Sequence, residues 1–305
     1  MKRIAITFLV FVIAACAGGP GVKLEAPAGD PESAANDQTE AAVVATEAPT
    51  SQPEEILPGI EVVPISEMAK EIPWLDTDIK AVPMTTFIGI NFHIPPFDNP
   101  LVRKAFSLAI DRQRISDGEK SRGSATSMPA TTFIPPQMLG RDLYSAVGLN
   151  FNAEEAKKTL IDAGFSDVGQ LPAIEIVFYK GSTDQVNAYK DMWKTALGVD
   201  VNLIPVKSGA ELYDTIDNQK PGLFILGAWI ANYNDPHNFT QDTFLNQESH
   251  YPPLAGTAFS GLVSRAEAAA NDPISRQKLY IEAEKLLCEQ EIYIIPVTHA
   301  VINMK

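Results

Sequence analysis

The stretch PFDNPLVRKAFSLAIDR, from Pro96 to Arg112, carries the clearest local signals in the 305-residue sequence. Asn99 is a residue type that caps helices through its side chain, and Pro100 suits the first helical position. Apolar residues then recur at the spacing of one helix face, at Val102, Ala105, Phe106, Ala109 and Ile110. The pattern predicts an amphipathic helix that packs against a core. The pair Asp111-Arg112 is expected to end this helix with a local ion pair and a cap.

Strands and helices are predicted on both sides of this helix. Residues 86–92 alternate as a strand, whereas residues 117–150, with several Pro and Gly, are expected to form a loop-rich crossing. Asn152, with Glu155 three residues later, matches a capping box, and Gly164 suits a left-handed helix stop. The later predictions are strands at 174–178, 199–203, 223–228 and 292–301, and helices at 184–197, 212–216, 260–271 and 274–290.

The order strand, helix, strand, helix, strand over residues 174–228 predicts an α/β layer with mainly parallel pairing. Pro296 interrupts the last predicted strand, and because proline has no N–H to donate, we expect an edge strand or a crossover there. Trp193 lies on an amphipathic helix and is expected in the core. Cys288, beside two leucines, is expected to be a buried structural thiol.

The N-terminal region has the features of an exported protein. Lys2 and Arg3 precede a short apolar run that ends in Ile13-Ala14-Ala15-Cys16, a pattern that resembles the lipobox of bacterial lipoproteins. We therefore expect lipidation of Cys16; the alternative is an ordinary signal peptide with a cysteine nearby by chance. Residues 17–58, acidic and rich in Ala, Pro, Glu and Thr, predict a disordered tether. The folded domain is then expected at residues 59–305.

Charge and residue usage exclude several classes of function. The formal net charge of −14 argues against nucleic acids and anionic lipid as partners. The four histidines are widely separated and form no i, i+4 pair, and no Gly-x-Ser-x-Gly motif is present. We therefore expect no enzyme, no metal and no cofactor. A hydrolase that depends on His237 or Asp235 is kept as a minor alternative.

Six stretches together resemble the bacterial extracellular solute-binding proteins of family 5, the oligopeptide, dipeptide and nickel binders of ABC importers. In the family's order they are PFDNPLVRKAFSLAIDR, NAEEAKKTLIDAGF, LPAIEIVFY, WKTALGVDVNL, WIANYNDP and DPISRQKLYIEAEKLL followed by IYIIPV. The resemblance implies a type II periplasmic-binding-protein fold, in which two lobes close over a peptide-like ligand. It covers only the family's C-terminal half, which implies a single lobe with part of the hinge region.

The resemblance also assigns roles within the loop WIANYNDPHNF, from Trp229 to Phe239. In peptide binders of the family, a Trp at the position of Trp229 helps to form the wall of the pockets that hold the ligand's side chains. An Asp at the position of Asn232 meets the ligand's amino terminus, so this chain has an amide where the family has a carboxylate. Trp229, Asn232 and Tyr233 are the expected ligand-binding residues. Asp235 is expected to make a turn with its proline.

The sequence of this loop allows two other interpretations. Asp235 and His237 could contribute to a metal site, and Asn238-Phe239-Thr240 matches a glycosylation sequon. Two ligands in one loop are too few for the first interpretation, and the second is uninformative in a bacterial lipoprotein.

The sequence thus predicts a lipid-anchored substrate-binding component, or half component, of an ABC importer for peptides or related solutes. Its expected place is the outer face of the cell membrane, on the periplasmic or extracellular side. Its expected partners are a peptide-like solute, the ABC permease subunits and the membrane, through the lipid. The alternative is an interaction module or truncated remnant that pairs with the permease or a separately encoded N-terminal lobe, and binds no ligand alone.

Overall fold

A computed structural model describes residues 80–139, 147–246 and 249–304. The strands are β1 (Lys80–Ile90), β2 (Met128–Pro129), β3 (Ile174–Tyr179), β4 (Val201–Val206), β5 (Leu223–Ile225), β6 (Ala228–Ile230) and β7 (Ile294–Met304). The longer α-helices are α2 (Pro100–Leu108), α3 (Arg112–Ser121), α6 (Ala153–Asp162), α7 (Thr183–Leu197), α8 (Gly209–Gln219), α10 (Ala258–Ala268) and α11 (Pro273–Lys285). Short helices are α4 (Pro136–Leu139), η1 (Val168–Gln170), η2 (Lys180–Ser182) and α9 (Pro236–Thr240), with π-helices η3 (Gln241–Leu245) and η4 (Leu286–Gln290). The predicted leader, Cys16 and the tether lie outside the described residues.

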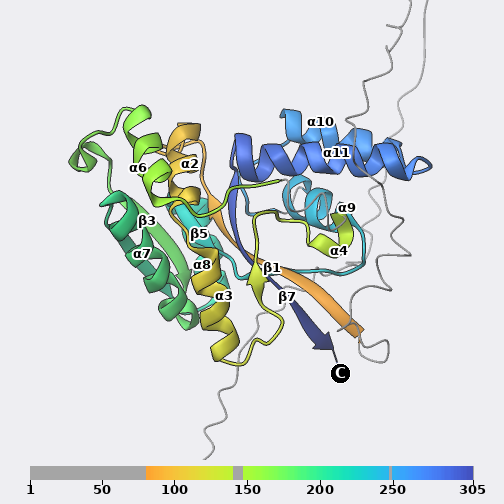
Figure 1. Cartoon of the computed structure of the whole chain (residues 1–305), viewed down its shortest axis with the longest axis horizontal. Coiled ribbons are helices and arrows are strands. Elements are labelled where there is room, and N and C mark those ends of the chain that lie inside the picture. Colours follow the sequence, from red (N-terminus) through yellow and green to blue (C-terminus); the bar gives the residue numbers. More distant parts are fainter. Residues whose placement is uncertain (1–79, 140–146, 247–248, 305) are drawn as a thin grey trace, which may run out of the picture. The chain divides into compact units, whose positions relative to one another are not determined.

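The strands form one mixed sheet in the order β2-β7-β1-β5-β3-β4, with β6 also paired to β1 (Figure 1). Strand β3 pairs in parallel with β4 and β5. Strand β1, in contrast, pairs antiparallel with β5, β6 and β7, and β2 pairs antiparallel with β7. The α/β class is therefore confirmed, as is the parallel pairing expected for the layer of β3, β4 and β5, whereas β1 adds an antiparallel half to the sheet.

Alternation along the strands separates two cores on opposite faces of the sheet. Ile88 and Ile90 of β1 belong to a core with the apolar faces of α2, α6 and α7. Phe87, one position before Ile88 and therefore on the opposite face, belongs to a second core with α9, α10 and α11. A smaller cluster lies between α8 and the other face of β3, at Val177, Val206, Leu212, Ile216 and Phe224. Helices thus cover both faces.

The predicted start of α2 and both predicted ends of α6 are present in the structure. The Asn99 side chain caps α2 by accepting from the Leu101 N–H, and Pro100 occupies the first turn. The Asn152 side chain caps α6 through the Glu155 N–H at 3.0 Å. Gly164 follows α6 with a φ of 100°, a left-handed conformation that costs glycine little. The Asn152 cap and the glycine stop are confirmed, but the reciprocal bond of a capping box is replaced, because the Asn152 N–H donates to the Leu108 carbonyl.

Two predicted core residues are buried. Trp193 is fully buried among the helices of the first core, and its indole donates to the Phe106 carbonyl at 3.0 Å. Cys288 is buried in the second core, where burial raises the pKa of its thiol. Both assignments are confirmed.

The last strand differs from its prediction. Strand β7 begins at Ile294 and lies inside the sheet, between β1 and β2, rather than at an edge. The register slips next to the proline, because Phe87 faces Pro296 whereas Thr86 faces Thr298. Such an irregularity lets an interior strand accommodate the missing N–H.

Three other boundaries also differ. Residues 112–121 form helix α3, so the region predicted as a loop-rich crossing begins within a helix. The strand predicted at 223–228 is divided into β5 and β6, with Gly227 between them at a φ of 115°. The helix predicted to Gln290 ends as α-helix at Lys285 and continues as π-helix η4.

Asp111 and Arg112 have separate structural roles at the start of α3. The Asp111 carboxylate caps α3 by accepting from the Arg114 N–H, so the pair begins a second helix rather than ending the first. Arg112 is only 4% exposed, and its guanidinium turns to the backbone. Its guanidinium donates to the carbonyls of Ser107, Ile110 and Pro296, and so joins α2 to β7.

Replacing Arg112 by methionine is expected to lower the free energy of unfolding by about 3 kcal/mol, because three carbonyl groups lose a charged donor in a buried site. Urea unfolding followed by circular dichroism measures the change. Arg114, exposed on the same helix, gives the matched control Arg114→Met, for which we expect less than about 0.5 kcal/mol. Equal effects of the two substitutions would contradict the assigned role.

No helix among the described residues is both long and apolar enough to cross a lipid bilayer.

Candidate functional site

The predicted ligand loop leaves the sheet at β6. Strand β6 pairs with β1, with Trp229 opposite Thr85, and the Ala231 N–H donates to the Pro83 carbonyl at the point where the chain departs. The chain then turns and enters helix α9. The Asp235 carboxylate caps that helix by accepting from the His237 N–H at 2.8 Å, and Pro236 occupies its first turn. The turn-making role predicted for Asp235 is confirmed.

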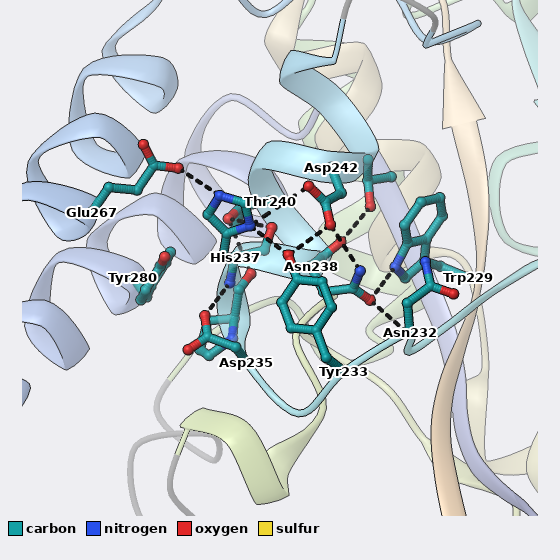
Figure 2. A network of polar contacts seen from close by, with 12 residues as sticks. Trp229, Asn232, Tyr233, Asp235, His237, Asn238, Thr240, Asp242, Glu267 and Tyr280 are labelled. Atoms are coloured by element: carbon teal, nitrogen blue, oxygen red, sulfur yellow. Dashed lines mark hydrogen bonds and ion pairs between the residues drawn. The ribbon is translucent and has the colours of Figure 1, made fainter. Parts of the chain in front are cut away.

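Asn238 holds the loop from inside (Figure 2). Its side chain is fully buried, and its Oδ1 accepts from the Trp229 indole and from the backbone N–H of Asn232, both at 3.1 Å. Its Nδ2 donates to Asp242 Oδ2 at 3.0 Å. One amide therefore links the end of β6, the turn and the π-helix η3.

The three predicted ligand residues lie close together along this loop but differ in exposure. Trp229 is half-buried against the second core, and its ring nitrogen points to Asn238. Asn232 is exposed and is bonded to Asn238 through its backbone N–H. Tyr233 is 44% exposed. The loop thus presents an amide and a phenol to solvent beside an indole whose orientation is fixed.

Tyr233 and His237 belong to a chain of polar contacts that ends on α10 (Figure 2). The Tyr233 hydroxyl donates to Asp242 Oδ2 at 2.7 Å and lies 2.6 Å from His237 Nδ1. His237 Nε2 lies 3.0 Å from Glu267 Oε1. Burial, followed by the Asp242 carboxylate, raises the pKa of Tyr233 well above its usual value, so the phenol keeps its proton.

An ion pair ties the loop to α11. The Arg276 guanidinium binds both oxygens of Asp235, at 2.7 and 2.9 Å, and also donates to the Tyr280 hydroxyl at 3.2 Å. Burial acts to raise the pKa of Asp235, but the bonds from Arg276 and the His237 N–H outweigh it, and the pKa lies below its usual value. Asp235 is therefore a charged anchor for the loop.

The contacts of this loop also bear on its interpretation as a metal site and on its interpretation as a glycosylation site. The Asp235 carboxylate faces Arg276, whereas the imidazole of His237 faces Tyr233 and Glu267, so the two side chains have different partners. Among the residues that the structure describes, no three His, Cys, Asp or Glu side chains are grouped to hold a metal ion. The sequon asparagine, Asn238, is fully buried with its amide engaged.

A separate hollow of about 520 Å³ lies at the start of α2, where Pro95 and Asn99 face Ala163 and Phe165 beyond α6. None of the three predicted ligand residues lines it. The candidate site is therefore the exposed loop surface and not this hollow.

Sequence reasoning missed the residues that hold the loop in place. Asn238 was considered only as part of a sequon, and Asp242, Glu267 and Arg276 were not singled out. A polar residue three positions after a helix cap was the only local signal for Asn238. Arg276 lies 41 residues from Asp235 in sequence, and no local pattern joins them.

Comparison with known proteins identifies the family. Residues 30–251 match the family described as "Bacterial extracellular solute-binding proteins, family 5 Middle". The chain belongs to this family. The periplasmic oligopeptide-binding protein OppA of Salmonella typhimurium is 29% identical over 246 residues, which are 77% of this chain and 43% of that protein. This family 5 chain thus spans less than half of that relative's length.

Solved structures share the fold of this family 5 protein. Haemophilus influenzae OppA, in complex with the peptide RPPGFSPFR, matches with a TM-score of 0.58 at 23% identity, over 79% of this chain and 47% of that one. A peptide-binding protein of a peptide ABC transporter matches with a TM-score of 0.58 at 22% identity, over 72% of this chain and 99% of that one. The expected family and the expected partial periplasmic-binding-protein fold are confirmed.

Proposed function

We infer that this protein is the substrate-binding component, or half of one, of an ABC importer for peptides or related solutes. Family membership and the peptide-binding relatives support this inference. The ligand is held non-covalently by Trp229, Asn232 and Tyr233, without catalysis or a cofactor. The partners on this proposal are the permease subunits, whereas a separately encoded N-terminal lobe is a partner on the alternative, the interaction module.

The observation that carries the proposal is the buried amide of Asn238. It fixes the indole of Trp229 and the backbone of Asn232 while leaving the Asn232 side chain exposed. A binding residue must be held in place before the ligand arrives, because ordering it on binding costs affinity. Buried support beneath exposed polar groups is the arrangement expected of a binding loop rather than of a simple turn.

Native mass spectrometry and calorimetry of the full chain test the proposal. We expect the protein to retain peptides from the expression host, or to bind members of a random tetrapeptide library with free amino termini. The absence of both would refute ligand binding by this chain alone. Folding or peptide binding only with a second polypeptide would instead favour the interaction module.

A substitution at position 232 gives a sharper test of the proposed contact with the ligand's amino terminus. Asn232→Asp restores a carboxylate, and a charge-assisted hydrogen bond to an ammonium is about twice as strong as a neutral one. We expect free-amine tetrapeptides to bind about fivefold more tightly. N-acetylated versions of the same peptides should show no gain. Calorimetry measures both sets of affinities.

Asn234, exposed one position beyond Tyr233, supplies the control. Asn234→Asp adds the same charge to the same loop, so a general electrostatic attraction would strengthen binding equally in both variants. Equal gains, or no gain for Asn232→Asp, would contradict the assigned contact between position 232 and the ligand's amino terminus.

Anchoring at the membrane through Cys16 is part of the same proposal. Its support is the run Ile13-Ala14-Ala15-Cys16 behind a short apolar segment. Cells supplied with labelled palmitate should label the wild-type protein, and Cys16→Ser should abolish the label and release the protein from the membrane fraction. Undiminished labelling of the variant would refute the anchor.

A further inference from the structure

The hollow beside the first turn of α2 has fixed walls. Helices α2 and α6 lie side by side (Figure 1), and the Asn99 side chain at the start of α2 donates to the Ala163 carbonyl at the end of α6, at 3.4 Å. The turn before α2 is held by its own backbone, because the Asp98 N–H donates to the Ile94 carbonyl at 3.0 Å. A hollow between such walls exists before a partner arrives, which lowers the cost of binding.

The lining of the hollow is mainly apolar, and apolar side chains are exposed around it. The volume is about 520 Å³, and five of the eight lining residues are apolar, namely Pro95, Pro96, Ala163, Phe165 and Pro172. Among the described residues, six large apolar side chains are exposed, and three of them lie within two positions of a lining residue. These three are Leu101, Ile161 and Val168. Exposed apolar side chains that gather in one place indicate an interaction surface.

The two segments that line the hollow carry only negative formal charge. Residues 94–100 and 162–173 contain Asp98, Asp162 and Asp167 but no lysine or arginine. Asp98 itself lines the hollow and is exposed, and its carboxylate makes no hydrogen bond or ion pair with a residue that the structure describes. The hollow therefore offers a carboxylate that a cationic group can bind.

The nearest basic side chains of α2 are engaged elsewhere. Arg103 attracts the carboxylate in the hollow, but its guanidinium is buried and donates to the backbone carbonyls of Phe97 and Glu291, at 2.7 and 2.6 Å. Lys104, at the next position, forms an ion pair with Glu155 of α6. A cation that binds in the hollow must therefore come from outside these helices.

We propose that this hollow is a docking surface for a basic, amphipathic segment of another polypeptide. An apolar side chain of that segment inserts between Pro95 and Phe165, and a lysine or arginine beside it binds Asp98. The lining residues do not include Trp229, Asn232 or Tyr233. The inference therefore does not rest on the proposed function.

A small molecule and a second copy of this chain fit the hollow less well. Sites for small molecules enclose about 70–90% of the ligand surface, whereas the lining residues Pro95, Asp98, Gln170 and Pro172 are exposed to solvent. In a symmetric pair of copies the same patch meets itself, so the carboxylates of the two hollows repel each other. A cationic segment avoids both difficulties, because it inserts only one or two side chains and brings the opposite charge.

Peptide titration of the full chain tests the docking surface. The probe is a peptide of two Leu-Lys-Lys-Leu-Leu-Lys-Leu repeats, acetylated and amidated so that its ends carry no charge, and a matched peptide has glutamate at each lysine. We expect calorimetry to detect binding of the basic peptide alone, and amide NMR signals of residues 94–101 and 161–172 to shift. Binding of both peptides, binding of neither, or shifts confined to other residues would overturn the proposal.

Substitutions at two exposed lining positions locate the effect of charge. Gln170→Lys places a cation in the hollow and should weaken binding of the basic peptide about fivefold, whereas Asp98→Asn removes the carboxylate and should weaken it about threefold. Gln219→Lys and Asp214→Asn make the same changes in charge at exposed positions of α8 that do not line the hollow, and should alter the affinity less than about 1.5-fold. Equal effects of a lining substitution and its control would show only a general attraction between an acidic protein and a basic peptide, and would overturn the proposal.

Two further measurements separate this surface from other interactions. Gln170→Lys should leave the affinity for free-amine tetrapeptides unchanged, and an equal loss for both kinds of peptide would overturn a separate docking surface. If the basic peptide binds at the hollow but tetrapeptides do not bind, the docking surface stands and the proposed function fails. A wild-type dimer in sedimentation that Gln170→Lys abolishes would assign the hollow to a second copy and overturn the proposal.

Discussion

An Asn238→Ala variant is expected to unfold with a free energy about 3 kcal/mol below that of the wild-type protein, and to bind peptide at least about tenfold more weakly. The side chain that is removed makes three hydrogen bonds at a fully buried position, to the Trp229 indole, the Asn232 N–H and the Asp242 carboxylate. Truncation leaves two donors and one acceptor without this partner. Urea unfolding and calorimetry measure the two effects.

Two further variants at this loop separate the hydrogen bonds from other causes. Asn234→Ala removes an exposed amide from the same loop and should change stability by less than about 0.5 kcal/mol. Asn238→Asp keeps an acceptor for Trp229 and Asn232 but places a carboxylate oxygen against Asp242 Oδ2, so it should be destabilised at pH 7. Acidification should restore part of its stability by protonating one of the two carboxylates. Similar stabilities of Asn238→Ala and Asn234→Ala would show that Asn238 does not support the loop.

The helix caps and stops were predicted correctly, because each depends on residues that are close together in the sequence. Asn99, Asn152 and Gly164 act within four residues of their own positions, so their capping roles can be inferred from short windows of sequence. The core role of Trp193 followed from its place on an amphipathic helix in the same way. These elements, and the family resemblance that they carry, gave the α/β class correctly.

Pairing between distant segments could not be predicted in this way. Strand β1 lies beside β7, more than two hundred residues later, and nothing near Pro296 shows that an irregular register will admit it to the sheet interior. Parallel pairing was inferred from the alternation of strands and helices, which describes β3, β4 and β5 but not β1. The antiparallel half of the sheet depends on contacts that a single sequence window does not contain.

In the candidate site, too, features that depend on nearby residues were predicted, and features that depend on tertiary contacts were not. The turn at Asp235 was predicted because an Asp-Pro pair has a local preference, and the structure confirms it. The role of Asn238 depends on its burial, and that of Glu267 depends on the approach of α10 to the loop. Burial and approach are tertiary properties. The exposed residues of the site were therefore accessible from the sequence, and the residues that support them were not.

The stability of the folded protein is expected to decrease as the pH rises from 6.5 to 8, because of Glu284. Its carboxyl group is completely buried on α11 and accepts from the N–H groups of Phe133 and Ile134. Burial raises its pKa to about 8, against a value of 4.5 without the fold, despite these two donors. The folded state therefore binds a proton that the unfolded state has released. The resulting stabilisation is complete below pH 4.5 and is lost as the pH rises through 8.

A buried histidine has the opposite effect on the pH dependence of stability, and it acts at lower pH. His299 lies in β7 with its Nδ1 2.8 Å from the Thr85 hydroxyl, and burial lowers its pKa from 6.5 to about 3. The unfolded state binds the extra proton, so the contribution of His299 is present above pH 6.5 and is lost as the pH falls towards 3. Between pH 4.5 and 6.5 the two slopes oppose each other. The effect of Glu284 is therefore visible alone only above pH 6.5.

Urea unfolding of the wild-type protein and of Glu284→Gln between pH 6.5 and 8 isolates this effect. The wild-type protein should lose about 2 kcal/mol over that range, since each pH unit corresponds to about 1.4 kcal/mol for one proton. Glu284→Gln cannot titrate, and its curve should be flat relative to the wild type even if the variant is less stable throughout. Glu282→Gln, exposed on the same helix, should follow the wild-type slope. Parallel curves for the wild type and Glu284→Gln would mean that Glu284 stays ionised in the fold, with Phe133 and Ile134 donating strongly enough to outweigh its burial.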